Sequence, residues 1–241
     1  MPEHRQLSIS EAYCEEYFKN TTTRKVSGRF IVRLPRKKGI VLGDSKQQAI
    51  RRFYALERRL KRQSSIKDEY VQFMREYEQK GHMSLVMPSS IVKEKAYFIP
   101  HQPVLRPESI TTKLRVVFDA SAKTDNNNSL NNMLMAGPNL QGDLLHILLR
   151  FRNYEFVLTG DIAMMFCQIL IAEEDRNLQH ILWREKEEHP LKTFALNTVT
   201  YGTKSAPYLV MRCLKQLVIK EGEQFPMAQQ ALRSDFIWTT S

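Results

Sequence analysis

The sequence predicts a mixed fold of the α+β or α/β class rather than a helical bundle. Segments with helical periodicity alternate with short β-prone runs through the second half of the chain. Apolar residues make up 42% of the 241 residues and charged residues 26%, which is the balance of a globular protein. No run of about 18 apolar residues is present, so no transmembrane helix is expected. The first ten residues, MPEHRQLSIS, lack the apolar region of a signal peptide.

Two helices are predicted in the first hundred residues, after an alternating, extended stretch at 26–43. The first begins near Asp44-Ser45, and the second near Ser65, where Ser65 and Asp68 could form a capping box. Gly81 suits the end of the second helix. Apolar stripes at helical spacing define the two helices: Ala49, Phe53, Leu56 and Leu60, then Ile66, Tyr70, Phe73 and Tyr77. The two helices are expected to pair as a basic hairpin, with the stripe aromatics in the core rather than stacked on bases.

The middle of the chain predicts an extended connection, a strand and a helix. Three prolines between Tyr97 and Pro107 exclude a helix there. The run KLRVVFDAS (113–121) predicts a strand followed by a turn, and a polar loop rich in asparagine comes next. Apolar spacing from Leu140 to Phe151 predicts a helix capped by Asn139.

The last third predicts three strands and one further helix. YEFVLTGD (154–161) is interpreted as a buried strand that ends in a carboxylate, and HILWRE and TFALNTV as two more strands. Pro207 suits the first turn of a helix that reaches about Lys220, with Gly222 behind it. The final run, Asp235 to Trp238, has the character of a strand.

The positive charge is confined to one part of the chain. Residues 1–100 contain 21 Lys and Arg against 11 Asp and Glu, a net charge of +10, whereas residues 101–241 contain 15 of each. A solvated basic face is one interpretation, but segregation on this scale favours a polyanionic partner such as nucleic acid. The three cysteines are far apart, which predicts neither a disulfide framework nor a zinc site and fits a reducing compartment.

Three short segments contain residues that could act in catalysis or binding, and each segment also has a simpler structural interpretation. Asp161, with Phe166 five residues on, could hold a metal or act as a base, although spacing alone favours a helix cap. Lys113 and Arg115 share one face of a strand and could bind phosphates, or could protect an exposed edge. Gly202, in TVTYGTKSAPYLVMR, would allow another group to approach the backbone closely.

In this order, the three pieces resemble the motif series of reverse transcriptases. The closest resemblance is to the Bel/Pao family of long-terminal-repeat retrotransposons, over residues 10 to 236. The similar stretches include CEEYFKNTTTR, SGRFIVRLP, LGDSKQQAIRRFYALERRLKR, EYEQKGHM, YFIPHQPVLRPES-TTKLRVVFDASAKT, GDIAMMFCQI, HILWR and YGTKSAPYLV.

The resemblance implies an α+β right-hand polymerase fold, with residues 1–95 as a basic helical region before or within the fingers and residues 96–241 as fingers and partial palm. By resemblance, Lys113 and Arg115 contact the triphosphate of a dNTP, and Asp161 is a catalytic, metal-binding carboxylate. Phe166 resembles the gate against a 2′-hydroxyl, Tyr201 and Gly202 form the turn beneath nucleotide and template, and Pro207 starts the palm helix. Residues expected to bind nucleic acid, the cations through template phosphates, are Arg51, Arg52, Arg58, Arg59, Lys61, Arg62 and Pro207.

The sequence departs from the family pattern in two places. Ala163, Met164 and Cys167 stand where charged residues are usual. The Tyr-x-Asp-Asp motif expected after Asp235-Phe236 is replaced by Ile237-Trp238-Thr239-Thr240. Magnesium prefers oxygen ligands with charge, which threonine lacks. A one-base deletion would explain this: TTT TAT ATG GAC GAC CTC becomes TTT ATA TGG ACG ACC TC, which encodes Phe-Ile-Trp-Thr-Thr-Ser. We therefore expect a sequence that stops before the palm hairpin and lacks the thumb.

The predicted function is that of a reverse transcriptase fragment that binds nucleic acid and dNTP and is catalytically defective. The alternatives are a non-catalytic basic nucleic-acid-binding module and an unstable relic. The resemblance further implies Mg²⁺ or Mn²⁺ as cofactor, RNA template and DNA primer as partners, and no membrane. It also implies a cytoplasmic location in a virus-like particle, with protease, RNase H and integrase parts in the parent polyprotein.

Overall fold

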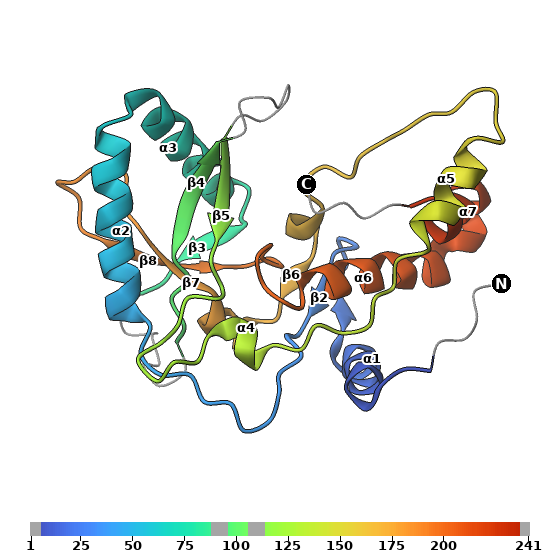
Figure 1. The fold of residues 1–241 in the computed structure, drawn as a ribbon, viewed down its shortest axis with the longest axis horizontal. Helices are drawn as coiled ribbons and strands as arrows, with labels where there is room; N and C mark the ends of the chain where they lie inside the picture. Colours follow the sequence, from blue (N-terminus) through green and yellow to red (C-terminus); the bar gives the residue numbers. More distant parts are fainter. Residues whose placement is uncertain (1–5, 88–95, 106–113, 237–241) are drawn as a thin grey trace.

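The structure is a computed structural model that describes residues 6–87, 96–105 and 114–236 (Figure 1). The elements of the first half are α1 (Ile9–Thr21), β1 (Thr23–Arg24), β2 (Phe30–Val32), α2 (Lys46–Lys61), α3 (Ser64–Gln79), β3 (Met83–Leu85), β4 (His101–Leu105), β5 (Leu114–Phe118) and α4 (Leu130–Met133). Those of the second half are α5 (Leu144–Phe151), η3 (Met165–Gln168), β6 (Leu170–Ile171), η4 (Glu173–Gln179), β7 (His180–Trp183), β8 (Lys192–Leu196), α6 (Ala206–Glu221), η5 (Gly222–Gln224) and α7 (Pro226–Ser234).

Helices and small sheets are mixed along the chain, which confirms the α+β class. Within the described residues the strands form three sheets, ordered β1-β2-β6, β3-β8-β7 and β4-β5. All of these pairings are antiparallel except β2 with β6, which is parallel. Strands from before and after residue 95 pair with one another, β2 with β6 and β3 with β8. The division at residue 95 stays a prediction.

The basic helical hairpin predicted from periodicity is confirmed. Helices α2 and α3 lie side by side against the sheets, and all four stripe residues of α2 are buried (Figure 1). In α3, Tyr70 and Tyr77 are buried as predicted, together with Met74. The predicted capping box is wrong, because α3 begins at Ser64 and no side chain caps it.

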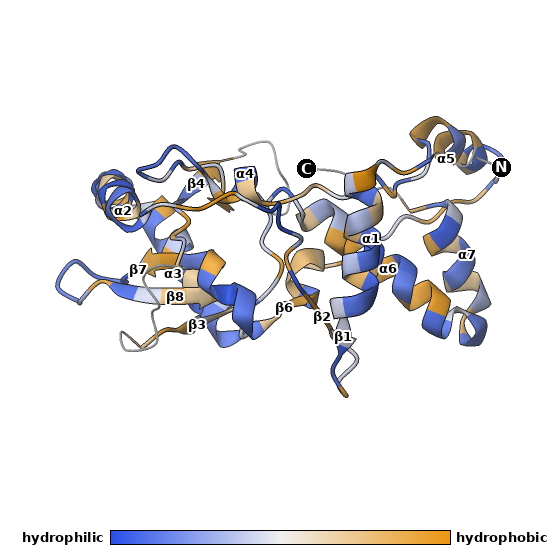
Figure 2. Cartoon of the chain, turned by 90° about the horizontal axis from the view of Figure 1, so that it is seen from below, coloured by the Kyte–Doolittle hydropathy of each residue, from blue (hydrophilic) through white to orange (hydrophobic). Residues whose placement is uncertain are grey.

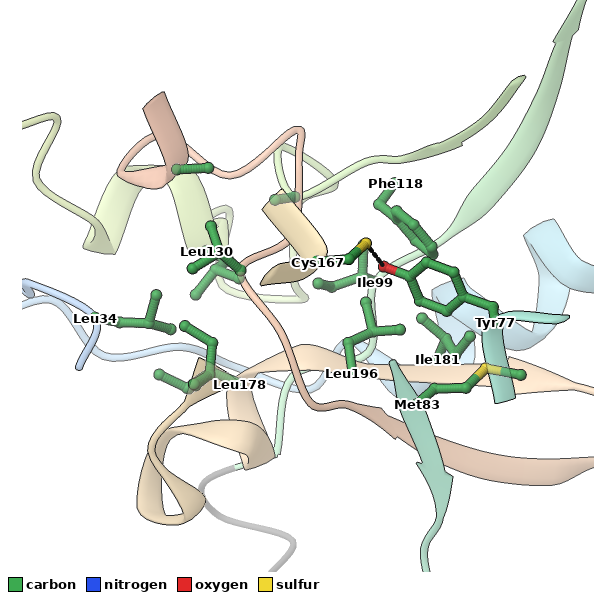
Figure 3. Close-up of a cluster of buried hydrophobic side chains, with 14 of the residues drawn as sticks. Leu34, Tyr77, Met83, Ile99, Phe118, Leu130, Cys167, Leu178, Ile181 and Leu196 are labelled. Atoms are coloured by element: carbon green, nitrogen blue, oxygen red, sulfur yellow. Dashed lines mark hydrogen bonds between the residues drawn. The ribbon is translucent and has the colours of Figure 1, made fainter. Parts of the chain in front are cut away.

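The described core is continuous from α1 to α6. Figure 3 shows Tyr77 of α3 beside Ile181 of β7 and Leu196 of β8, with Cys167 of η3 above them. The Cys167 thiol donates a hydrogen bond to the Tyr77 hydroxyl, with an S–O distance of 3.6 Å. Burial raises the pKa of both groups above their ordinary values, so both stay protonated at neutral pH.

Two predictions for residues 139–161 are wrong. The helix there is α5, which is capped by Asp143: the Leu145 N–H donates to Asp143 Oδ1 at 2.8 Å. Residues 154–161 form no strand and are exposed, with Phe156 86% and Leu158 99% accessible. A strand requires a hydrogen-bonded neighbour, and the described part of the chain pairs none with this stretch. Figure 1 shows it arching from α5 back towards η3.

Among the described helices, none combines the length and apolar character needed to cross a bilayer. Figure 2 shows that α2 is largely hydrophilic, whereas α5 carries much hydrophobic character. The exposed apolar residues of α5 are Leu144, Leu145, Leu148, Leu149 and Phe151.

Candidate functional site

Strand β5 places Arg115 beside a large pocket. Burial alternates along the strand, so Leu114, Val116 and Phe118 face the core while Arg115 is half-buried. β5 pairs with β4, where Arg115 lies opposite Val104. The Arg115 guanidinium forms no hydrogen bond or ion pair with any described residue, so its donors are free for an anion. Lys113, its predicted companion, lies outside the described residues.

The turn formed by residues 201–204, which we call the docked turn, packs against the end of β5. The Tyr201 hydroxyl donates to the Val116 carbonyl oxygen at 2.6 Å, and its ring lies 5.2 Å from the Phe118 ring centroid. Burial raises the pKa of Tyr201 well above its ordinary value, so the hydroxyl remains a donor.

Gly202 is required at its position in the docked turn. It has φ +93°, and a Cβ atom there would lie 2.2 Å from the Phe118 carbonyl oxygen. Any other residue would meet both backbone strain and a collision with main chain. The predicted close approach at Gly202 is thereby confirmed, with β5 as the approaching group.

Helix α6 begins directly after the docked turn. Pro207 occupies the first turn of the helix, as predicted, and is exposed. Its missing N–H costs nothing there, because the first N–H groups of a helix have no partner within the helix. The residues around it are buried, including Ala206 and Tyr208, so α6 holds the docked turn from its C-terminal side.

Asp161 and Phe166, which lie before and within η3, line the same pocket as Arg115 and the docked turn. Asp161 is exposed and caps no helix, so the helix-cap interpretation is wrong; η3 starts at Met165, after Met164 in a left-handed conformation with φ 49°. Phe166 lies on η3, with its ring centroid 5.9 Å from that of Tyr201. Asp161 makes no hydrogen bond or ion pair with another described residue.

These residues line one pocket of about 1160 Å³. The predicted site residues at its walls are Arg115, Asp161, Phe166, Tyr201, Gly202 and Pro207. They come from separate stretches of the chain: β5, the region before and within η3, and the junction of the docked turn with α6. The sequence order that suggested a site therefore corresponds to a shared cavity.

Three further charged residues line the pocket and were not predicted: Arg150, Lys204 and Asp235. Arg150 Nε donates to Asp235 Oδ1 at 3.1 Å, so these two charges compensate each other. Lys204 makes no side-chain hydrogen bond to a described residue. Its place inside YGTKSAP was a signal that could have identified it, because a residue in a turn that lines a pocket is well placed to face it.

The basic residues that were predicted to bind nucleic acid on and just after α2 do not line the pocket, and they fall into two groups. Arg52 pairs with Asp119, and Lys61 Nζ lies 3.2 Å from Glu187 Oε2. The other group is exposed and has no ion-pair partner among the described residues: Arg51, Arg58, Arg59 and Arg62. The predicted cluster is thus split into two engaged and four available cations.

The described residues contain no group of three or more His, Cys, Asp or Glu side chains placed to hold a metal ion. Asp161 is the uncommitted carboxylate of the pocket, since Asp235 pairs with Arg150. Magnesium is commonly held by one or two carboxylates together with substrate phosphates. Asp161 fits that role, but not the role of a complete protein cage.

A scan against protein-family models finds no match to the chain, and a search of curated proteins finds no relative.

Proposed function

We propose that the chain is a fragment of a retrotransposon reverse transcriptase with a right-hand fingers and palm architecture, which binds nucleic acid and a dNTP without transferring the nucleotide. The observation that supports this most is the convergence of six separately predicted residues on one pocket. The pocket is large enough for a nucleotide, because small-molecule sites span roughly 300–1,000 Å³. Its walls combine cations, aromatic rings and a carboxylate.

Each wall has a chemical role in this proposal. The free Arg115 guanidinium binds the triphosphate bidentately, and Lys204 adds a second cation. Phe166 and Tyr201 form an aromatic surface against the sugar and base. Asp161 would hold Mg²⁺ or Mn²⁺ together with the phosphates, and the cation would neutralise part of their charge.

Transfer is not proposed for this chain, because it needs more than binding. In-line displacement requires two cations held by several carboxylates. The sequence after Phe236 places Thr239 and Thr240 where the family has two aspartates. Neutral hydroxyls do not supply the charge that holds a second cation. The cytoplasmic location and the protease, RNase H and integrase partners expected from the resemblance remain part of the proposal.

Binding of dTTP with Mg²⁺, measured by calorimetry, tests the nucleotide site. We expect Arg115→Ala to weaken dTTP binding by about tenfold, the effect of losing one charge-assisted contact. Arg58→Ala removes the same charge from α2, outside the pocket, and is the matched control; it should leave dTTP affinity unchanged. Equal affinities for both variants and the unsubstituted chain would contradict the site.

Primer extension with Mg²⁺ or Mn²⁺ tests the proposed defect. The chain should incorporate no nucleotide, whereas it should retain dTTP binding. Incorporation that disappears in Asp161→Ala would show an active polymerase and overturn the defect while supporting the site.

The second candidate function is a nucleic-acid-binding module without a nucleotide site, and α2 favours it. Arg51, Arg58 and Arg59 of α2, and Arg62 just after it, are exposed without an ion-pair partner among the described residues, and Tyr54 is also exposed among them. Such a surface binds phosphates without reading sequence. Arg58→Ala should weaken binding to single-stranded RNA and reduce the slope of log K against log salt by about 0.7. RNA binding with this slope, in a chain that does not bind dTTP, would select the second candidate.

A further inference from the structure

The docked turn is held from behind by a side chain that does not line the pocket, Asn131 of α4. Its Nδ2 donates to the Gly202 carbonyl oxygen at 3.0 Å and to Ser121 Oγ at 2.8 Å. Its Oδ1 accepts from the Lys204 N–H at 2.7 Å. Both ends of the amide are therefore committed, and two of the three bonds end on main chain of the docked turn.

Asn131 is itself fixed to the segment that follows β5. Its backbone N–H donates to the Ala120 carbonyl oxygen at 3.0 Å. The short helix α4 around it is held by a capping box, in which Ser129 and Asn132 exchange hydrogen bonds. The side chain therefore starts from a fixed backbone and bridges the end of β5 to the docked turn.

The two bonds to the docked turn fix one peptide orientation on each side of Thr203. Gly202 is the residue with φ +93°, and a glycine has no side chain of its own to hold such a conformation. Asn131 supplies that restraint from outside. Tyr201 precedes Gly202, and Lys204 follows Thr203. The restraint therefore fixes the main-chain positions from which these two pocket-lining side chains extend.

We propose that Asn131 is a positioning residue for the nucleotide site, acting through the main chain of Gly202 and Lys204. The inference rests on the proposed function, since it assigns the pocket to a dNTP. Pre-placing binding groups strengthens binding because less order has to be imposed when the ligand arrives. Loosening the docked turn therefore weakens dTTP binding although Asn131 does not touch the nucleotide.

Asn131→Asp is the test, with Asn128→Asp as its matched control. Asn131→Asp preserves size and the acceptor for the Lys204 N–H, but it sets a carboxylate oxygen against the Gly202 carbonyl. Asn128→Asp makes the same charge change and also removes a bond from Nδ2 to a carbonyl, that of Val41 at 2.9 Å, away from the docked turn. The full chain is titrated with dTTP and Mg²⁺, and separately with single-stranded RNA.

We expect Asn131→Asp to weaken dTTP binding about tenfold relative to Asn128→Asp, because one restraining hydrogen bond becomes a repulsion. RNA affinity, which α2 provides, should be equal in the two variants. Hydrogen exchange at the Lys204 amide should rise in Asn131→Ala, which removes its acceptor, and not in Asn128→Asp. A purely structural role would instead lower both affinities together. If Asn131→Asp does not fold, Asn131→Ala, which lacks the repulsion, should give the same pattern with a smaller loss.

The outcomes separate this inference from the function on which it rests. Equal dTTP affinity in Asn131→Asp and Asn128→Asp overturns the role of Asn131 and leaves the nucleotide site intact. No dTTP binding by the unsubstituted chain overturns the proposed function, and the nucleotide role of Asn131 with it.

Discussion

Two walls of the same pocket are built in opposite ways. The docked turn is fixed on β5 by the Tyr201 hydroxyl, by the close approach of Gly202 and by the amide of Asn131. The facing stretch at 154–161 pairs with no described strand and exposes Phe156 and Leu158 almost completely. The docked turn has main-chain and side-chain partners, whereas residues 154–161 form no strand pairing with any described residue.

This difference shows which wall of the pocket has a position determined by packing within the described chain. The main chain of the docked turn and of β5, from which Arg115 extends, has a position set by packing and hydrogen bonds. Asp161 lies at the end of the stretch that pairs with no described strand, so the packing of the described chain does not fix its position. The proposed binding of a triphosphate can therefore rely on the wall formed by β5 and the docked turn, whereas the proposed placement of a metal ion by Asp161 cannot.

The largest predicted effect is at Gly202. Gly202→Ala should destabilise the fold by about 3 kcal/mol or more, because the new methyl meets the Phe118 carbonyl and the positive φ is strained. Gly160→Ala is the control on the other wall: a Cβ there meets no atom within 4 Å. It should leave stability unchanged or raise it by a few tenths of a kcal/mol. Urea unfolding measures both; equal losses would show that the two walls are alike.

A smaller loss of stability is expected at acid pH, through a histidine of β4, the strand that pairs with β5. His101 of β4 is buried, and burial lowers its pKa to about 4; its Nε2 lies 2.9 Å from the Leu182 carbonyl oxygen. The unfolded state, with a histidine pKa of about 6.5, binds the proton more tightly. Stability is therefore fully present above pH 6.5 and is lost as pH falls towards 4, by on the order of 3 kcal/mol.

The measurement for this prediction is urea unfolding between pH 4 and 7. His101→Gln should flatten the profile, whereas His189→Gln, at an exposed histidine on the β7–β8 connection, should not. His180 is also buried with a pKa lowered to about 4, so part of the slope will remain in His101→Gln. An unchanged slope in His101→Gln would contradict the assignment.

The sequence predictions succeeded for elements that pack on described neighbours and failed for the stretch at 154–161. Periodicity predicted α2 and α3, the β-prone run KLRVVFDAS predicted β5, and Pro207 with Gly222 predicted α6. Each of these elements buries an apolar face against neighbours within the described chain. It failed at 154–161, where an apolar, β-prone run has the composition of a strand but no neighbour to pair with. Composition reports what a segment could bury, and pairing decides whether it does.

Some residues of the candidate site could be predicted from the sequence, and others could not. The order of the motifs along the chain grouped Arg115, Asp161 and Tyr201 as one site, and the pocket contains all three. Asn131 could not have been predicted, because its role depends on two main-chain groups that lie 71 and 73 residues further along the chain. No local pattern in LNNM distinguishes it from Asn132, which caps its own helix instead.

A moderate effect is expected when the Tyr201 hydroxyl is removed. Tyr201→Phe leaves the Val116 carbonyl without its donor and should cost about 1 to 2 kcal/mol, the range for a hydrogen bond lost in a poorly solvated place. Tyr154→Phe removes the same hydroxyl from the other wall, where the side chain is 66% exposed, and should cost nothing measurable. Urea midpoints at pH 7 compare the two; an equal loss in both would mean that the Tyr201 bond does not hold the docked turn.

The smallest effect belongs to Leu158, the most exposed apolar residue of the unpaired stretch. At 99% accessibility, its side chain loses no buried area when it is replaced, so Leu158→Ser should change the free energy of unfolding by less than about 0.5 kcal/mol. The same substitution at Leu196 of β8, which is fully buried, should cost several kcal/mol through a cavity and an unsatisfied hydroxyl. Because exposed apolar side chains favour association, Leu158→Ser should also reduce light scattering at high protein concentration. A loss of stability at Leu158 comparable with that at Leu196 would place the stretch in a packed structure. Asp161 would then have the fixed position that the present arrangement denies it.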